Sequence, residues 1–319
     1  MVITITVPVY NEETVVREFY ERVKSMIKTL KNHSFELLFI NDGSKDNTLK
    51  YLQEIAERDS SVRIIDFSRN FGHQAAIFAG IENANCDAAI IIDGDLQDPP
   101  EVIPQMIKKW EQGYEVVYGK RIKREGESLF KRLTAFIFYR FINMLSDIEI
   151  PKDVGDFRLI DKKVINVLKT QNEKNIFIRG LISWIGFRQT FVEYERDKRY
   201  AGNTKYPLIK MLNFAFDGIT SFSTKPLRMS MLLGFICIII SMGLIIYTLI
   251  MKYAYPDMVI SGWTSLFIAV IFFGGIQLFT IGVVGEYIGK VYRETKNRPL
   301  YIIREKIGFN VTEDKESVE

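Results

Sequence analysis

An acidic loop, Asp93-Gly-Asp-Leu-Gln97, carries the clearest chemical signal in this chain. Asp93 and Asp95 follow an apolar run, and a spacing of two lets both carboxylates face one point from an extended backbone. Gly94 between them permits the close approach of a ligand. Two hard oxygen ligands suit Mg²⁺ or Mn²⁺, with further oxygens from a phosphate and water, and Gln97 can add a carbonyl oxygen. Such an ion would neutralise a diphosphate leaving group, although an acidic surface turn is the plainer alternative.

The elements around this loop alternate in type. Short runs rich in β-branched residues predict buried parallel strands, separated by segments of helical spacing with mixed charge. This repetition predicts a doubly wound, mostly parallel α/β sheet. Ligands of such sheets lie at the carboxyl ends of the strands, which brings together the loops Pro8–Glu13, Asn41–Asp46 and Asp93–Pro100. The predicted strands are Val2–Val7, Glu36–Ile40, Val62–Phe67, Ala88–Ile92 and Glu115–Tyr118, and the predicted helices are Glu12–Leu30, Asn47–Arg58, Gln74–Asn83 and Glu101–Glu111.

Two uncharged apolar runs lie near the C-terminus, at Met229–Met251 and Met258–Gly285. A helix needs about 20 apolar residues to cross a bilayer, so the runs predict a hairpin of two transmembrane helices, 229–251 and 261–285. The alternative is a pair of core helices in a soluble protein. Basic residues favour the cytoplasmic side, so the domain in front of the hairpin and both termini are expected in the cytoplasm, with the protein in the cytoplasmic membrane. The basic flanking residues are Lys225, Arg228, Lys290, Arg293, Lys296 and Arg298.

The composition agrees with a domain of this kind. The chain has 319 residues and a net charge of +3, which does not indicate a nucleic-acid binder. Its two cysteines, Cys86 and Cys237, suggest neither a disulfide nor a metal site. The N-terminus lacks the basic and apolar regions of a signal peptide. With two distant histidines and no cysteine cluster, a zinc site is not expected.

Two apolar segments in the middle of the chain carry regularly placed polar residues. Both 129–145 and 206–222 fit helices that lie in a membrane interface, and ordinary amphipathic core helices are the alternative. The predicted division is therefore a catalytic domain at 1–205, an interfacial segment at 206–228, the hairpin at 229–288 and a tail at 289–319. Glycines at 274, 275, 282 and 285 would let helices approach closely, from which we expect a homo-oligomer.

Five motifs occur in order along the chain: Val7-Pro-Val-Tyr-Asn-Glu-Glu13, Asn41-Asp-Gly-Ser-Lys-Asp46, Phe71-Gly-His-Gln74, Asp93-Gly-Asp-Leu-Gln-Asp-Pro-Pro100 and Gly155-Asp-Phe-Arg-Leu159. Together they resemble those of the family 2 glycosyltransferases of GT-A fold, and within them the polyprenyl-phosphate group that includes dolichyl-phosphate mannose synthases and bactoprenol glucosyltransferases. The resemblance covers about residues 1–300. It implies transfer of a sugar, with inversion, from a nucleotide diphosphate sugar to the phosphate of a membrane polyprenol such as undecaprenyl phosphate, with Mg²⁺ or Mn²⁺.

The resemblance also assigns roles to residues. Asp156 matches the candidate catalytic aspartate, which orients the acceptor or serves as a base. The resemblance assigns the binding of the donor nucleotide to Pro8, Tyr10, Glu12 and Asp42. It assigns the diphosphate to Asp93, Gly94 and Asp95, and the metal to Asp93, Asp95 and Gln97. Arg199 and Lys205 match a loop that closes over the diphosphate, and Arg121 and Arg132 match the grip on the acceptor phosphate.

Several of these residues have a plainer interpretation. Pro8 can simply end a strand, Asp42 can form a turn, and Arg132 can be a membrane-snorkelling arginine. Asp98 is expected to cap the next helix, and Arg158 to pair with a carboxylate. For His73, a hydrogen bond at a helix start is favoured over a place in the site.

Alternative functions remain to be compared. A processive polysaccharide synthase would carry a Gln-x-x-Arg-Trp motif, which the sequence lacks. A non-catalytic scaffold would not need the acidic loop, and a dehydrogenase would need a G-x-G-x-x-G after the first strand. UDP-glucose is the preferred donor, and donors carrying N-acetylglucosamine, mannose or an aminoarabinose derivative stay open.

Overall fold

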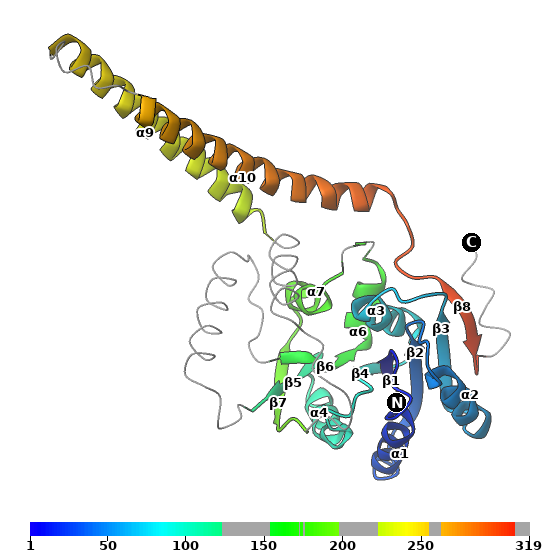
Figure 1. Cartoon of the computed structure of the whole chain (residues 1–319). Coiled ribbons are helices and arrows are strands. Elements are labelled where there is room, and N and C mark those ends of the chain that lie inside the picture. The colour runs from blue at the N-terminus through cyan, green and yellow to red at the C-terminus, as the bar shows by residue number, and fades with distance from the viewer. Residues whose placement is uncertain (123–153, 172, 175, 198–222, 255–262, 310–319) are drawn as a thin grey trace.

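The computed structural model describes residues 1–122, 154–171, 173–174, 176–197, 223–254 and 263–309. Within them, eight strands form one sheet in the order β7-β5-β6-β4-β1-β2-β3-β8 (Figure 1). The neighbours β4, β1, β2 and β3 pair in parallel, as do β5 and β7, whereas β6 and β8 run antiparallel to their neighbours. The strands are β1 (Val2–Val9), β2 (Ser34–Asn41), β3 (Val62–Phe67), β4 (Ala88–Ile91), β5 (Val116–Arg121), β6 (Val154–Asp161), β7 (Gln189–Tyr194) and β8 (Ile303–Ile307).

Helices cover both faces of this sheet. The predicted doubly wound α/β architecture is therefore confirmed, and the five predicted strands and four predicted helices all occur. One face packs against α1, α2 and α4, and the other against α3, α6 and α7. The helices are α1 (Val16–Ile27), α2 (Thr48–Arg58), α3 (His73–Asn83), the 3₁₀ helix η1 (Pro100–Val102), α4 (Ile103–Glu111), α6 (Lys162–Lys169), α7 (Ile178–Ile185), α9 (Lys225–Ala254) and α10 (Trp263–Thr295).

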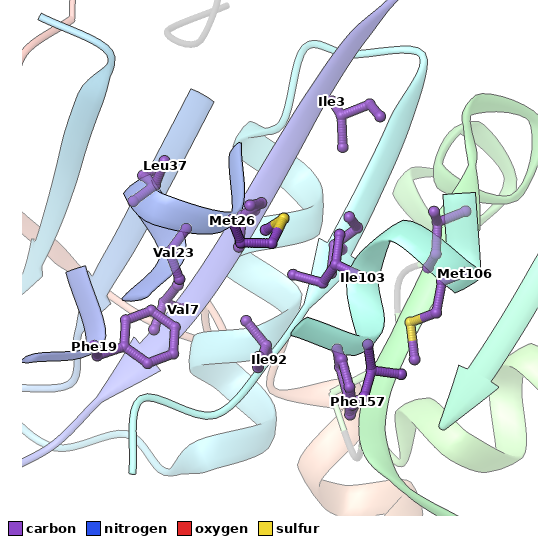
Figure 2. Close-up of a cluster of buried hydrophobic side chains, with 14 of the residues drawn as sticks. Ile3, Val7, Phe19, Val23, Met26, Leu37, Ile92, Ile103, Met106 and Phe157 are labelled. Carbon is purple, nitrogen blue, oxygen red and sulfur yellow. The ribbon is translucent and has the colours of Figure 1, made fainter. Parts of the chain in front are cut away.

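Alternation along β1 explains how the central strand serves both layers. Ile3, Ile5 and Val7 point into the larger core, where α1 and α4 contribute residues such as Phe19 and Met106 (Figure 2). The intervening threonines lie on the opposite side, beneath α3. The Thr6 hydroxyl donates to the carbonyl oxygen of Ile90 at 3.1 Å, so this buried polar group is satisfied.

Three strands were absent from the prediction. β6 is inserted between β4 and β5 and carries Asp156, whereas β7 and β8 form the two edges of the sheet. The prediction of a plain tail at 289–319 is therefore wrong in part. Residues 289–295 continue α10, and 303–307 return to the sheet as β8, whose short Ile-Arg-Glu-Lys-Ile sequence gave little apolar signal.

The two apolar runs form long helices that lie side by side and extend away from the sheet (Figure 1). Both are long and apolar enough to cross a membrane, over Lys225–Gly243 and Phe272–Thr295. A Cβ added at any of the four glycines of α10 expected to mediate packing would meet no atom of the described residues within 4 Å, and the homo-oligomer stays a prediction. The expected interfacial helix at 129–145 and residues 206–222 lie outside the described residues.

Gly80 on α3 lies where the helix packs closely on β1 of the sheet. A Cβ there would lie 2.9 Å from Thr6 Cβ. Because this atom cannot swing away, Gly80→Val should destabilise the domain by about 1–3 kcal/mol and lower its melting temperature in detergent. Ser25→Val, at an exposed position of α1, is the matched control and should change the melting temperature little. Equal melting temperatures for the two variants would contradict this packing.

Candidate active site

The loops after β1 and β2 are linked to each other. The backbone N–H of Asn11, a residue with φ of 55°, donates to Ser44 Oγ at 3.0 Å. In the other direction, the N–H of Lys45 donates to Asn11 Oδ1 at 2.9 Å. Pro8 lies inside β1, in register with Ile40, so it does not end the strand. Tyr10 is exposed and Glu12 half-buried at this edge. Their contact with a nucleotide, which the resemblance implies, stays a prediction.

Asp42 joins the β2 loop to the start of α3. Its two carboxylate oxygens accept the backbone N–H groups of Phe71, at 2.6 Å, and Gly72, at 3.0 Å. Burial raises the pKa of Asp42, although these two hydrogen bonds oppose the shift. Gly43 is required here, because its φ is +64° and a Cβ would lie 2.4 Å from the carbonyl carbon of Arg69. The Asp42 carboxylate thus joins two distant segments rather than forming a turn of its own loop, and its contact with a nucleotide base stays a prediction.

The acidic loop lies against the end of β1. A Cβ on Gly94 would approach Val9 Cγ1 to 2.8 Å, so the backbone fits only as glycine. Asp95 Oδ1 accepts the N–H of Gln97 at 3.0 Å around Leu96, which has a left-handed φ of 57°. A buried leucine held in that conformation is a local strain of a kind found at functional sites.

Asp93 is the least compensated carboxylate of the site. Its Oδ1 is buried and accepts no hydrogen bond in the described part of the chain, with His73 Nε2 3.4 Å away. Burial raises the pKa of Asp93 to about 6. The carboxylates of Asp156, Asp98 and Asp95 act in the same direction, whereas His73 opposes them.

His73 lies between two carboxylates. Its Nε2 is 3.4 Å from Asp93 Oδ1 and 3.4 Å from Asp156 Oδ2. Burial disfavours a charged ring, but the two carboxylates outweigh it and raise the pKa of His73 to about 9. The favoured expectation of a hydrogen bond at the helix start is wrong, because the His73 side chain instead joins the acidic loop to the Gly155-Asp156 motif.

Asp156 is held by an arginine that the sequence analysis missed. Arg179, on α7, donates through Nε and Nη2 to the two oxygens of Asp156 at 2.7 and 2.9 Å. The Asp156 side chain is only 5% exposed. Burial opposes its ionisation, but the guanidinium of Arg179, with His73 and Arg158, holds the pKa of Asp156 well below its usual range. A signal was available, since Arg179 is the lone charge in the apolar helix Ile-Arg-Gly-Leu-Ile-Ser-Trp-Ile.

Arg158 contributes from the same strand. Its Nη2 lies 3.9 Å from Asp156 Oδ1 and donates to the Gly155 carbonyl oxygen at 2.8 Å. Burial lowers the pKa of Arg158 to about 10, although Asp156 favours the charged form. Arg158 therefore pairs with a carboxylate as expected, but its distance to Asp156 is longer than that of Arg179.

Asp98 forms a second buried charge cluster. It is fully buried, accepts the Tyr194 hydroxyl at 2.6 Å, and has Arg121 and Arg196 at 3.4 Å. The expected N-cap role of Asp98 is wrong, since Pro99 precedes η1 and no side chain caps it. The guanidinium of Arg121 reaches over Gly155, where a Cβ would lie 2.5 Å from Nη2. Arg121, which is predicted to meet the acceptor phosphate, thus lies beside Asp156.

Three predicted residues, Arg132, Arg199 and Lys205, lie outside the described residues. The segment that leads to the last two is nevertheless fixed to the acidic loop. The N–H of Asp197 donates to the Gln97 carbonyl oxygen at 3.0 Å. Arg22, on α1, pairs with both Glu101 and Asp197, at 2.7 and 3.3 Å.

The donor set suits a hard divalent cation that is completed by substrate. Asp93 offers a buried oxygen without a hydrogen bond, and Asp95 and Gln97 follow it in the same loop. Among the described residues, no group of three or more His, Cys, Asp or Glu side chains is arranged to hold a metal alone. Mg²⁺ typically takes one or two carboxylates and substrate phosphates, so these residues fit such an ion.

Comparisons with known proteins agree with this arrangement. Residues 4–168 match the family described as glycosyl transferase family 2, and residues 225–291 match the GtrB C-terminal hairpin. The chain is 52% identical over 308 residues to the uncharacterized glycosyltransferase YkcC of Bacillus subtilis, covering 96% of this chain and 94% of the relative. It is 44% identical to the prophage bactoprenol glucosyl transferase homolog of Escherichia coli, covering 95% and 99%. The chain therefore belongs to glycosyl transferase family 2.

The charge on His73 predicts a pH dependence. A histidine whose pKa is raised by folding contributes stability that is complete below its unfolded pKa of about 6.5 and is lost as the pH rises through its folded value. With a folded pKa of about 9, wild-type protein should melt above His73→Gln at neutral pH, and the difference should shrink as the pH rises through 9.

Melting curves in detergent at a series of pH values test this prediction. His33→Gln, which removes the chain's other histidine outside the site, is the control for loss of an imidazole. A wild-type advantage that stays constant through pH 9 would contradict a charged His73.

Proposed function

We propose that this glycosyltransferase moves a sugar, with inversion, from a nucleotide diphosphate sugar to the phosphate of a membrane polyprenol. UDP-glucose and undecaprenyl phosphate are the preferred substrates. Relatives that cover nearly the whole chain are named bactoprenol glucosyl transferases, which supports this acceptor and sugar. The chain would lie in the cytoplasmic membrane, with the two apolar helices as anchor and the sheet on the cytoplasmic side.

One observation carries the proposal: carboxylates and arginines are ordered at the carboxyl edge of the sheet. Asp93 and Asp95 lie next to a cluster in which Arg121 and Arg179 flank Asp156. A metal ion held by Asp93 and Asp95 would bind the diphosphate of one substrate. Arg121 and Arg179 would attract the phosphate of the other, so the two substrates would lie on either side of Asp156.

In this scheme each residue has a physical task. Tyr10, Glu12 and Asp42 would contact the nucleotide, with Pro8 and Gly94 letting the backbone approach. Asp93, Asp95 and Gln97 would hold Mg²⁺ or Mn²⁺, which supplies charge neutralisation for the departing diphosphate. Arg199 and Lys205 would close over that group, and Arg121 and Arg132 would bind the acceptor phosphate.

The reaction does not require a strong base. An oxygen of the polyprenyl phosphate, already anionic, would attack the anomeric carbon. A new bond from this phosphate oxygen to the anomeric carbon would form as the bond from the anomeric carbon to the nucleotide diphosphate oxygen breaks, and the nucleotide diphosphate would leave. Positioning and charge stabilisation then carry catalysis. Arg179 keeps Asp156 ionised with both oxygens engaged, which favours the orienting role of Asp156 over a role as base.

The first test is transfer of labelled sugar from a panel of donors to undecaprenyl phosphate, with the full chain in detergent. We expect a lipid product from UDP-glucose with Mg²⁺ or Mn²⁺ and none with EDTA, because an unneutralised diphosphate leaves poorly. A product from GDP-mannose, UDP-N-acetylglucosamine or a UDP-aminoarabinose donor would change the sugar but not the reaction class. No lipid product from any donor with folded protein would refute the acceptor.

Asp156→Asn should reduce transfer by about 100-fold or more, because it removes a charge that acts on the reacting groups, while donor binding stays nearly intact. Turnover and donor affinity should be measured on the same preparation. Asp161→Asn is the matched control. It lies at the other end of the same strand, away from the site. There Asp161 Oδ2 accepts from Trp110 Nε1 and Oδ1 accepts from the Lys163 N–H, so asparagine, with one oxygen, keeps one of these two bonds and the control reports the effect of a local loss of stability alone. If Asp156→Asn retains full activity and fold, the assignment of Asp156 is wrong.

A further inference from the structure

The chain returns to the sheet after its two apolar helices, and β8 pairs antiparallel with β3 (Figure 1). Ile64 lies opposite Ile307 and Ile65 opposite Lys306, with an irregularity near Phe67. Tyr301, just before β8, stacks on Phe67 at 4.9 Å, and its hydroxyl donates to Glu82 on α3. The segment that follows α10 is therefore firmly attached to the edge of the sheet.

From β8 a single arginine reaches a buried carboxylate. Arg304 Nη1 lies 3.3 Å from Asp66 Oδ2, and Arg304 Nη2 donates to the Ser68 carbonyl oxygen at 2.8 Å. The Asp66 side chain is 1% exposed, whereas that of Arg304 is 57% exposed. Because Asp66 Oδ2 is buried and accepts no hydrogen bond in the described structure, the ion pair with Arg304 is what compensates this oxygen.

The other oxygen of Asp66 leads to the loops at the carboxyl edge. Asp66 Oδ1 accepts Asn41 Nδ2 at 2.7 Å, and Asn41 Oδ1 accepts the N–H of Ser44 at 3.4 Å. Ser44 Oγ in turn accepts the N–H of Asn11. A continuous series of side-chain contacts thus runs from β8 to both loops that are assigned to the nucleotide.

We propose that Arg304 is a positioning residue for the nucleotide donor: it holds the Asp66 carboxylate in place, so that Asn41 keeps the loops after β1 and β2 in their binding geometry. This inference rests on the proposed function, because it assumes that these loops bind a nucleotide. The strand that follows the two apolar helices, β8, would then support the donor site without contacting a substrate.

Loss of Arg304 should act on the donor and spare the acceptor. Without its cation, Asp66 carries an uncompensated buried charge and Asn41 loses a fixed partner, so the two loops become less ordered before a nucleotide binds. Of the groups around Asp156, Arg179 and Arg121 come from α7 and β5, away from Arg304. Only His73 follows the segment that Arg304 contacts at Ser68. The expected signature is a raised donor KM with little change in acceptor KM.

The test compares wild type, Arg304→Gln and Arg304→Lys as full chains in detergent. Binding of UDP and of GDP, each with Mg²⁺, is measured by calorimetry, and KM values for donor and acceptor come from the transfer assay. Arg304→Gln should weaken nucleotide binding by about 5-fold or more, in the range typical of coupled sites, and Arg304→Lys should restore part of the loss. Arg17→Gln is the matched control, since Arg17 is 59% exposed and pairs with Glu54 away from these loops.

A second variant separates charge compensation from simple loss of structure. Asp66→Asn combined with Arg304→Gln removes the buried charge together with its partner, and it should bind nucleotide better than Arg304→Gln alone. Equal nucleotide affinity of Arg304→Gln and wild type would overturn the inference. So would a parallel loss of donor and acceptor affinity together with a lowered melting temperature. Failure of wild type to bind either nucleotide would instead refute the nucleotide donor itself.

Discussion

The candidate active site at the carboxyl edge of the sheet depends on the pairing of buried carboxylates with cationic side chains from distant parts of the chain. Asp156 on β6 is paired with Arg179 from α7 and His73 from α3, and Asp98 is paired with Arg121 from β5. A buried carboxylate without a partner costs several kcal/mol, so these elements can meet only in an arrangement that satisfies the charges. Apolar packing builds the sheet and its two helical layers, and the ion pairs then fix which side chains meet at its carboxyl edge.

The carboxylates of the site differ in how completely they are paired, and this difference bears on the chemistry. Both oxygens of Asp156 are occupied by one guanidinium, so this carboxylate stays charged and stationary. Asp93 instead has a buried oxygen that accepts no hydrogen bond from the residues that the structure describes, and burial raises its pKa to about 6. The site therefore contains one carboxylate whose charge is balanced within the protein and one that a cation brought with substrate would balance. That division suits a reaction in which a metal accompanies the leaving group while the acceptor is only oriented.

Sequence could predict the parallel half of the sheet, because β1 to β5 are uniform apolar runs separated by helical spacing. It could not predict β6, where Val-Gly-Asp-Phe-Arg-Leu-Ile-Asp places Asp156 and Arg158 among the apolar residues of a buried strand. Asp156 itself was found through a family motif, and the acidic loop through its spacing. Arg179 and the role of His73 were missed because their contacts with Asp156 join residues far apart in the chain, which no local pattern encodes. The role of Asp98 was mistaken for a similar reason, since the local Asp-Pro-Pro pattern suggested a helix cap while Arg121 and Tyr194 come from other strands.

The attachment of the apolar hairpin to the sheet bears on how a lipid substrate can meet the site. Near its start, the Ser223 carbonyl oxygen accepts the hydroxyl of Tyr287 from α10, and at its end Glu294 accepts the N–H of Lys174 in the segment before α7. Beyond that point β8 joins the sheet through backbone hydrogen bonds. The first of these contacts joins the two helices to each other, whereas Glu294 and β8 attach the end of the hairpin to the sheet domain. If the hairpin lies in the membrane as proposed, these attachments limit how far the carboxyl edge of the sheet can tilt relative to the membrane. A phosphate at headgroup depth would then meet Arg121 and Asp156 in a restricted geometry, which lowers the entropic cost of bringing the two substrates together.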